Sequence, residues 1–322
     1  MHEYFQDLRG AFHYPSFIEP IKLRTMADSV SDRDLTAFDA AFRWFRNGSR
    51  YVFLQDSDAL TLGASQLIDI LRHLMQCFPW IERVTSYSRS STIVRFDDDD
   101  LEVLRNAGLN RIHVGLESGS DKVLKMVRKG ASKEMHVKAG LKIKRAGMEL
   151  SEYVMPGLGG VELSEEHARE TANALNEIDP DFIRLRTLAV SDRAPISGER
   201  TSGRFHVCSD TMVVKEIKTL IENLSGINSV IKSDHILNLF EDLEGKMPQD
   251  RDKMLAVLDE FLAMEPQKRD LYRIGRRLGV FLGLKDLMDS DRVSRVEQVC
   301  QTNGITGENI DSVLDRLLQG FI

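Results

Sequence analysis

Short runs of β-branched and apolar residues alternate along the chain with longer stretches in which apolar residues recur every three or four positions. The short runs indicate buried strands, and the longer stretches indicate amphipathic helices. The predicted strands are 21–25, 51–55, 83–88, 111–116, 150–155 and 181–190. The predicted helices that follow them are 33–46, 65–78, 98–108, a region that is broken near Gly130 and resumes to Ala146, 164–178 and 209–224.

This alternation decides the expected fold class. Strand–helix units in succession predict parallel strands joined by right-handed crossovers, and therefore an α/β fold with a helix-covered sheet. The near-continuous apolar character of the strands fits burial on both faces. The strand pattern ends at about residue 228, and helical patterns continue after it. We therefore expect an N-terminal lead-in (1–20), an α/β core (21–227) and a helical C-terminal region (228–322), with an exposed loop over 191–205.

Polar residues gather directly after the predicted strands. Ligands of parallel α/β folds lie at the carboxyl ends of the strands, so these residues predict a pocket on one rim. They are Asp56, Ser57 and Asp58, then Ser86 to Ser88, Glu117 to Ser120, Met155 to Gly157, and Arg184 to Thr187. Further along, Ser164 and Ser209 are expected as helix N-caps.

Arg184 and Arg186 alternate with apolar residues on the last predicted strand, so both lie on one face. Two guanidinium groups on one face need an anion. Two alternatives stay open: the carboxylate of a ligand, or an internal pair with Glu117 or Glu152.

Charge and composition narrow the class of partner. The net charge is −7 and the pI is near 5.7, so no overall positive field attracts nucleic acid or an anionic membrane. No apolar run approaches the roughly 20 residues of a membrane span. The first twelve residues lack the basic and apolar regions of a signal peptide. We expect a cytoplasmic protein with a small-molecule ligand, and the sequence indicates no particular protein partner.

The three cysteines are Cys77, Cys208 and Cys300, and they lie far apart in the sequence. This spacing excludes a local metal or cluster motif of the CxxC type. In a chain without an export signal, such residues are expected to be reduced and mostly buried.

Four phrases of the sequence carry a family resemblance: "GLNRIHVGLESGSDKVLKMVRKG", "LSEYVMPGLGG", "EHARETANALNEIDPDFIRLRTL" and "SDHILNLFEDLEGKMPQDRDKML". Together they resemble the radical S-adenosylmethionine (SAM) superfamily, in particular members with a core like that of elongator or oxygen-independent coproporphyrinogen oxidase. The resemblance implies a partial (βα)6, TIM-like barrel of parallel strands. It also implies SAM and a [4Fe-4S] cluster as cofactors, with the cluster held by a CxxxCxxC loop after the first strand.

The cluster motif itself is missing from this chain. The stretch "YPSFIEPIKLRTMADSVSDRD" resembles the family's lead-in and first strand, so cysteines are expected just beyond Thr25. A gapless placement puts Ser29, Arg33 and Thr36 at those positions. These residue types are not useful iron ligands.

The resemblance also implies roles for individual residues toward SAM. Asp56, Ser57 and Asp58 occupy the place of a motif that receives the amino group, with helix capping as the alternative. Glu117 and Ser118 match positions that contact ribose hydroxyls, although Ser118 and Ser120 equally suit caps of the next helix. Gly157 belongs to a turn that leaves room for adenine. The remaining expected SAM-binding residues are Ser86, Tyr153, Arg184 and Arg186.

Three functional hypotheses follow, and whether the chain is an enzyme stays open. The first is a degenerate SAM-binding or scaffold protein without radical catalysis. The second is an active radical SAM enzyme whose cluster segment is missing from this reading of the gene. The third is a cluster-independent transferase that uses the same pocket.

Overall fold

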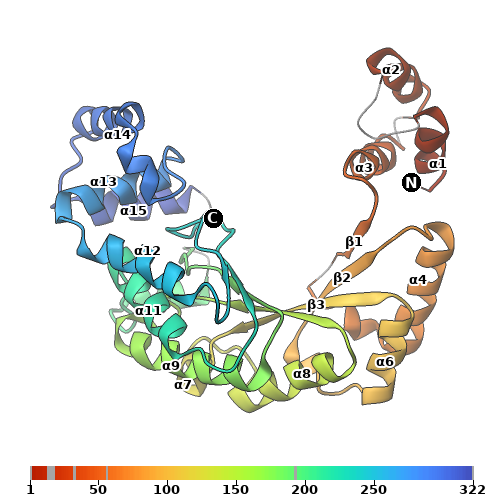
Figure 1. The fold of residues 1–322 in the computed structure, drawn as a ribbon, viewed down its shortest axis with the longest axis horizontal. Coiled ribbons are helices and arrows are strands. Elements are labelled where there is room, and N and C mark those ends of the chain that lie inside the picture. The colour runs from red at the N-terminus through yellow and green to blue at the C-terminus, as the bar shows by residue number, and fades with distance from the viewer. Residues whose placement is uncertain (1, 13–18, 32–33, 56, 192–193, 321–322) are drawn as a thin grey trace. The chain divides into compact units, whose positions relative to one another are not determined.

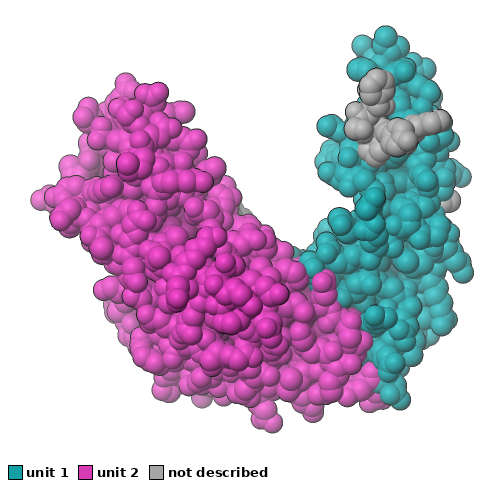
Figure 2. All heavy atoms as spheres, in the orientation of Figure 1, with its two compact units in different colours: residues 1–87, 99–111 teal, residues 88–98, 112–322 magenta. Residues whose placement is uncertain are grey.

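A computed structural model describes residues 2–12, 19–31, 34–55, 57–191 and 194–320, and Figure 1 shows its helices and strands. Its contacts divide the chain into two compact units, which Figure 2 colours separately. Unit 1 comprises residues 1–87 and 99–111, and unit 2 comprises residues 88–98 and 112–322. The strands are β1 (Tyr51–Leu54), β2 (Arg83–Ser88), β3 (Leu109–Glu117), β4 (Glu149–Val154), β5 (Phe182–Leu185), β6 (Val230–Lys232) and β7 (Gly245–Lys246).

The helices account for most of the remaining chain. The first group is α1 (His2–Ala11), α2 (Pro20–Asp28), α3 (Leu35–Arg46), η1 (Ala59–Leu62), α4 (Ala64–Cys77), α5 (Ser90–Ile93), α6 (Asp98–Asn106), α7 (Asp121–Met126) and α8 (Lys133–Arg145). The second group is α9 (Gly160–Ile178), α10 (Pro195–Thr201), α11 (Asp210–Asn223), α12 (Arg251–Ala263), α13 (Pro266–Arg277), η2 (Leu284–Met288), α14 (Ser290–Thr302) and α15 (Ile310–Gln319). Among the described residues, no helix combines the length and the apolar character that a membrane crossing requires.

Unit 1 is held together by aromatic side chains and a short parallel pair. Phe5 of α1 is fully buried, and its ring lies 4.7 Å from that of Trp44 on α3 and 5.4 Å from that of Trp80. Strand β1 pairs with β2 in parallel, with Tyr51 opposite Arg83. The first residues of β3 belong to this unit, and Asn110 accepts a hydrogen bond from the amide of Val84 at 2.8 Å.

Unit 2 contains the rest of β3 and the strands that follow it in order, β4 to β7. The β4–β5 and β5–β6 pairs are parallel, and β6–β7 is antiparallel. Helix α8 packs against β4 and α9, α9 packs against α11, and α11 packs against α12. Gly140 permits the close approach of α8, because a Cβ there would lie 2.6 Å from Ile178 and 3.2 Å from Leu150. The predicted α/β class with a mostly parallel, helix-covered sheet is therefore confirmed.

Several predicted elements differ from the structure. Segment 21–25 is not a strand: it lies in helix α2, which starts at Pro20, a residue suited to the first turn of a helix. Strands do not stop near residue 228, since β6 and β7 follow. The expected loop 191–205 contains helix α10. Ser209 caps α11 as predicted, whereas α9 begins at Gly160, so Ser164 lies inside the helix.

Candidate functional site

The sheet of unit 2 has one polar and one apolar face. Alternate residues Ile112, Val114 and Leu116 of β3 are fully buried, as is Ile183 of β5. The intervening positions carry His113 and Glu117 on β3, Tyr153 on β4, Arg184 on β5 and Lys232 on β6. Register places Tyr153 beside Arg184 and Arg184 beside Lys232, so these three share a face. The expectation of apolar burial on both faces is therefore wrong for these strands.

Glu117 is held in an unusual position at the end of β3. Its backbone is left-handed, with φ of 61°, which is rare for a residue with a side chain. Its carboxylate pairs with Lys129 at 3.2 Å, and both side chains are partly exposed. A Cβ at Gly115 would lie only 2.4 Å from the Glu117 carboxylate, so the absence of a side chain there makes room for this group. Such strained positions concentrate at functional sites.

Arg184 and Arg186 converge on one carboxylate. Asp234 accepts from Arg184 at 2.6 Å and lies 3.4 Å from Arg186. Burial alone would raise the pKa of Asp234, but the two guanidinium groups, Arg184 first, outweigh it and lower the pKa. The predicted internal partners, Glu117 and Glu152, are therefore not the ones used. Because two positive groups share one negative group, this cluster has an excess positive charge.

The ring of Tyr153 lies close to the side chains of both Arg186 and His113. The guanidinium of Arg186 lies 5.0 Å from the centre of the Tyr153 ring, a cation–π distance. The centre of the His113 ring lies 5.5 Å from the centre of the Tyr153 ring. Tyr153 is half-buried, so its ring is a flat, partly exposed surface between charged side chains.

Glu152 lies on the opposite, apolar face. It is fully buried, and neither carboxylate oxygen has a hydrogen-bond partner among the described residues. Burial, helped by the charge of Glu117, holds the pKa of Glu152 well above its usual range. Burial therefore favours the neutral, protonated form of this carboxyl group.

A buried hydrogen-bond network joins the loops after β3 and β4. Ser118 is fully buried, and its hydroxyl lies 2.8 Å from Nδ1 of His167 on α9. Nε2 of His167 is 3.1 Å from the carbonyl of Met155 and 3.5 Å from Glu216 of α11. Burial lowers the pKa of His167 to about 4, so its ring is neutral. Since a carbonyl only accepts, Nε2 carries the proton and Nδ1 accepts from Ser118.

Glu216 completes this network. Its carboxylate accepts from the amide of Gly157 at 2.6 Å and from the hydroxyl of Ser164 at 2.5 Å. Burial raises the pKa of Glu216 to about 7, against the opposing effect of these two hydrogen bonds.

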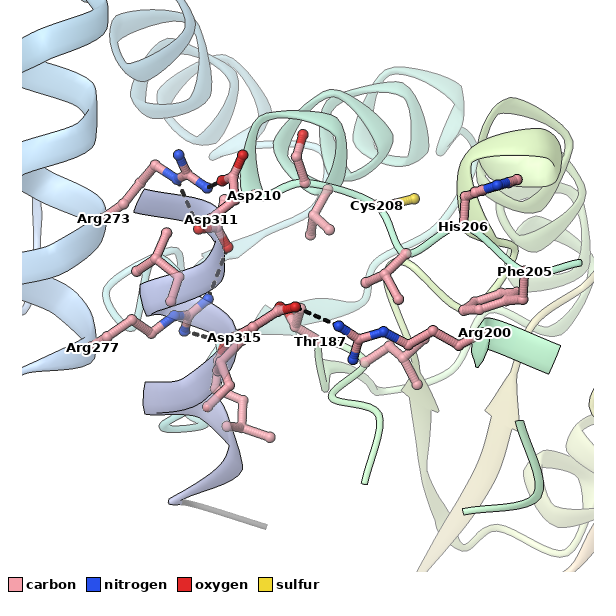
Figure 3. A pocket seen from close by; sticks show the side chains of 17 residues that line it. Thr187, Arg200, Phe205, His206, Cys208, Asp210, Arg273, Arg277, Asp311 and Asp315 are labelled. Atoms are coloured by element: carbon pink, nitrogen blue, oxygen red, sulfur yellow. Dashed lines mark hydrogen bonds and ion pairs between the residues drawn. The ribbon is translucent and has the colours of Figure 1, made fainter. Parts of the chain in front are cut away.

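A separate cavity of about 390 Å³ lies between α10, α11, α13 and α15 (Figure 3). Arg273 and Arg277 reach into it from α13, and Asp210 at the start of α11 accepts from each of them at 2.9 Å. Asp311 and Asp315 of α15 pair with Arg273 and Arg200, respectively. Burial alone would raise the pKa of Asp210, but Arg277 and Arg273 outweigh it and lower the pKa. This cavity contains none of the residues predicted for SAM.

The structure places the predicted site residues in three groups. Glu117, Tyr153, Arg184 and Arg186 lie on or beside the polar face of unit 2. Ser118 and Gly157 belong to the buried hydrogen-bond network that joins the loops after β3 and β4. Ser57, Asp58 and Ser86 lie in unit 1, where Ser86 is fully buried and donates to the carbonyl of Tyr87 at 3.1 Å. Asp56 lies outside the described residues, and all these assignments remain predictions.

Three functional candidates were not found from the sequence: Asp234, His167 and Glu216. Glu216 had a usable signal, because it stands at a helical spacing among Val213, Ile217 and Leu220, where an apolar residue is expected. A carboxylate at a buried position needs hydrogen-bond donors, and the structure supplies two. Asp234 gave no such signal.

The cysteines offer no cluster site. Cys77 lies on α4, Cys208 precedes α11 and Cys300 lies on α14, and all three are free thiols. In the described part of the chain, no three His, Cys, Asp or Glu side chains are grouped so as to hold a metal ion. Among the described residues, no group of side chains therefore fits a [4Fe-4S] cluster.

Comparison with known proteins finds a family match over part of the chain. The family model described as "Radical SAM superfamily" matches residues 28–172, which include β1 to β4 and most of α9. This segment, somewhat less than half of the chain, is similar to the radical SAM superfamily. The tRNA-2-methylthio-N(6)-dimethylallyladenosine synthase of Bacillus subtilis (strain 168) is 31% identical over 129 residues, which is 39% of this chain and 24% of that protein. The chain thus spans about a quarter of the length of this curated relative.

Two solved structures are similar to the chain with low TM-scores. Elp3 of the archaeon Methanocaldococcus infernus is 14% identical with a TM-score of 0.48, over 64% of this chain and 55% of that one. The radical S-adenosylmethionine methyltransferase TsrM of Kitasatospora setae, with tryptophan and a SAM analogue bound, is 17% identical with a TM-score of 0.36, over 48% and 29%.

Proposed function

We propose that this radical SAM family protein binds SAM on the polar face of unit 2 and does not itself carry out radical chemistry. The observation that carries the proposal is the carboxylate of Glu117, held in a left-handed conformation over Gly115. A fixed, partly exposed carboxylate can accept hydrogen bonds from both hydroxyls of a ribose. The active-enzyme and transferase hypotheses remain as alternatives to be tested.

The surrounding charges suit the other end of SAM. Arg184 and Arg186 share Asp234, so the excess positive charge of this cluster can attract the SAM carboxylate. Tyr153 offers an aromatic surface between the two regions. When bound, SAM supplies an alkyl group activated by its sulfonium, and the residues of the chain hold and orient it. Asp58 and its neighbours in unit 1 are not needed for this proposal.

Glu117→Gln is expected to weaken SAM binding about tenfold, because a hydrogen bond to a charged group contributes roughly 1.5–3 kcal/mol and an amide replaces it only in part. Isothermal titration calorimetry with SAM and with S-adenosylhomocysteine measures this. The matched control is Glu134→Gln, an exposed glutamate on α8 that should leave the affinity unchanged. Equal affinity of Glu117→Gln and the wild type would contradict the proposed site.

Anaerobic incubation with iron and sulfide, followed by desalting, is expected to leave well below one iron per chain. The reason is that the chain lacks three thiolates on one loop. The control replaces Cys77, Cys208 and Cys300 together by serine, and we expect the same background. About four irons per chain in the wild type alone would restore the active-enzyme hypothesis. Transfer of a methyl or aminocarboxypropyl group from SAM to an acceptor would favour the cluster-independent transferase instead.

A further inference from the structure

The loops after β3 and β4 are connected through one buried path. Ser118 accepts from the amide of Ser120 at 3.0 Å and donates to His167. Gly119 donates its amide to Thr171 at 2.9 Å, and the Thr171 hydroxyl lies 3.4 Å from the same His167 nitrogen. The loop after β3 is thereby attached to α9 by two side chains one helical turn apart.

The loop after β4 is attached to the other end of that path. His167 donates from Nε2 to the carbonyl of Met155, and Glu216 accepts from the amide of Gly157. Met155 and Gly157 flank Pro156 in the glycine-rich turn, and Met155 also donates its amide to the carbonyl of Glu117 at 3.0 Å. His167 is therefore in contact with both loops at once.

We propose that Ser118, His167 and Glu216 are positioning residues that hold the loops after β3 and β4 in one fixed relation, so that the ribose and adenine ends of the SAM site are set together. The proposal rests on the proposed function for its ligand, but not for the coupling itself. Ser118 thereby has a different role from the ribose contact that the resemblance implied. Its side chain is fully buried, and its hydroxyl donates to His167 and is not available to ribose.

The ionisation of Glu216 provides a way to observe the coupling. A carboxylate accepts a stronger hydrogen bond than a carboxylic acid, so the Gly157 amide proton should move downfield as Glu216 loses its proton. The pKa of Glu216 is about 7, so this change occurs as the pH rises through neutrality. The groups facing Glu216 are Ser164 and neutral His167 from α9, and the Cys208 thiol, whose pKa burial raises to about 12. None of them titrates in the same range.

The experiment records amide spectra of full-length protein labelled with 15N-glycine, between about pH 5.5 and 8.5. In the wild type we expect the amide signals of Gly157 and Gly119 to shift with pH and to share one midpoint. Glu216→Gln, which keeps a side-chain oxygen as acceptor, should remove that midpoint from both signals. A midpoint that persists in this variant belongs to a group other than Glu216 and overturns the proposal.

His167→Phe separates coupling from packing, because it keeps the ring volume but removes both hydrogen bonds. In this variant we expect the amide signal of Gly157 still to shift with pH, whereas that of Gly119 should no longer follow it. The affinity for SAM should fall about tenfold. The matched control is Val214→Ala, a fully buried change on α11 outside the network, which should leave both signals coupled. If the amide signals of Gly157 and Gly119 in the wild type shift with different midpoints, the inference is overturned.

The same experiment distinguishes the two proposals. A wild type that shows the shared midpoint but does not bind SAM would refute the proposed function while leaving the coupling of the loops in place. A wild type that binds SAM but whose Gly119 amide signal does not change with pH would refute the coupling of the loops while supporting the proposed function.

Discussion

Replacing Asp210 with alanine is expected to lower the free energy of unfolding by about 3–5 kcal/mol, the usual cost of breaking a buried ion pair from one side. The side chain of Asp210 is 12% exposed, and those of Arg273 and Arg277 are 8% and 2% exposed. Without Asp210, Arg277 has no carboxylate partner among the described residues and keeps only the carbonyl of Leu237 as a hydrogen-bond acceptor. Urea or guanidinium unfolding of the full-length protein measures the loss.

Asp259→Ala is the matched control for Asp210→Ala. Asp259 also pairs with a basic residue, Lys218, but its side chain is 53% exposed, so the change should cost no more than about 1 kcal/mol. Because Arg277 and Arg273 lower the pKa of Asp210, its contribution is present above the ordinary aspartate pKa and is lost only as the pH falls through the lowered value. Equal losses in the two variants would show that the buried cluster contributes nothing beyond a surface pair.

Gly119→Ala is expected to destabilise the protein by about 3 kcal/mol, at the upper end of overpacking changes. A Cβ at this position would lie 2.2 Å from the carbonyl oxygen of Glu170 and 2.7 Å from Cα of Thr171. Both atoms belong to the backbone of α9, which cannot yield as a flexible side chain can. The loop after β3 must therefore move away from the helix, and SAM affinity should fall together with the melting temperature.

Gly198→Ala is the control for Gly119→Ala, and it should act in the opposite direction. Gly198 lies within helix α10, and nothing lies within 4 Å of its ideal Cβ. Alanine is favoured over glycine in a helix by about 1 kcal/mol, so this variant should be slightly more stable than the wild type. A loss of stability in Gly198→Ala, or none in Gly119→Ala, would contradict these close-contact distances.

The sequence was sufficient to predict elements whose apolar pattern is long or regular. The segments 51–55, 83–88 and 150–155 became β1, β2 and β4 within a residue or so, and 65–78 became α4. The failures have physical causes. Helix α2 buries none of its residues, so its sequence carries no burial pattern, and Ile21 and Thr25 suggested a strand. Strands β6 and β7 are too short for any periodicity to appear.

The candidate site was predictable only in part, for a related reason. Glu117 could be found because it directly follows the predicted strand 111–116 and is the last residue of β3, and the sequence pattern alone indicates where a strand ends. The partner of Arg184 and Arg186 could not, because Asp234 comes about fifty residues later, after β6. Likewise, His167 and Glu216 acquire their roles only when α9 packs against α11. Contacts of this kind depend on tertiary packing, which no local pattern records.

The position of β6 also bears on how the chain can be divided. A protein cut at residue 227 would leave β5 as the open edge of its sheet, with the backbone groups that pair with Val230 to Lys232 facing water. Exposed edges of this kind recruit strands from other molecules and lead to aggregation. The same cut would remove the partners of Arg184 and Asp210. Residues beyond 228 therefore cover the edge of the sheet at β5. A shortened form that lacks them should be recovered mainly as insoluble material.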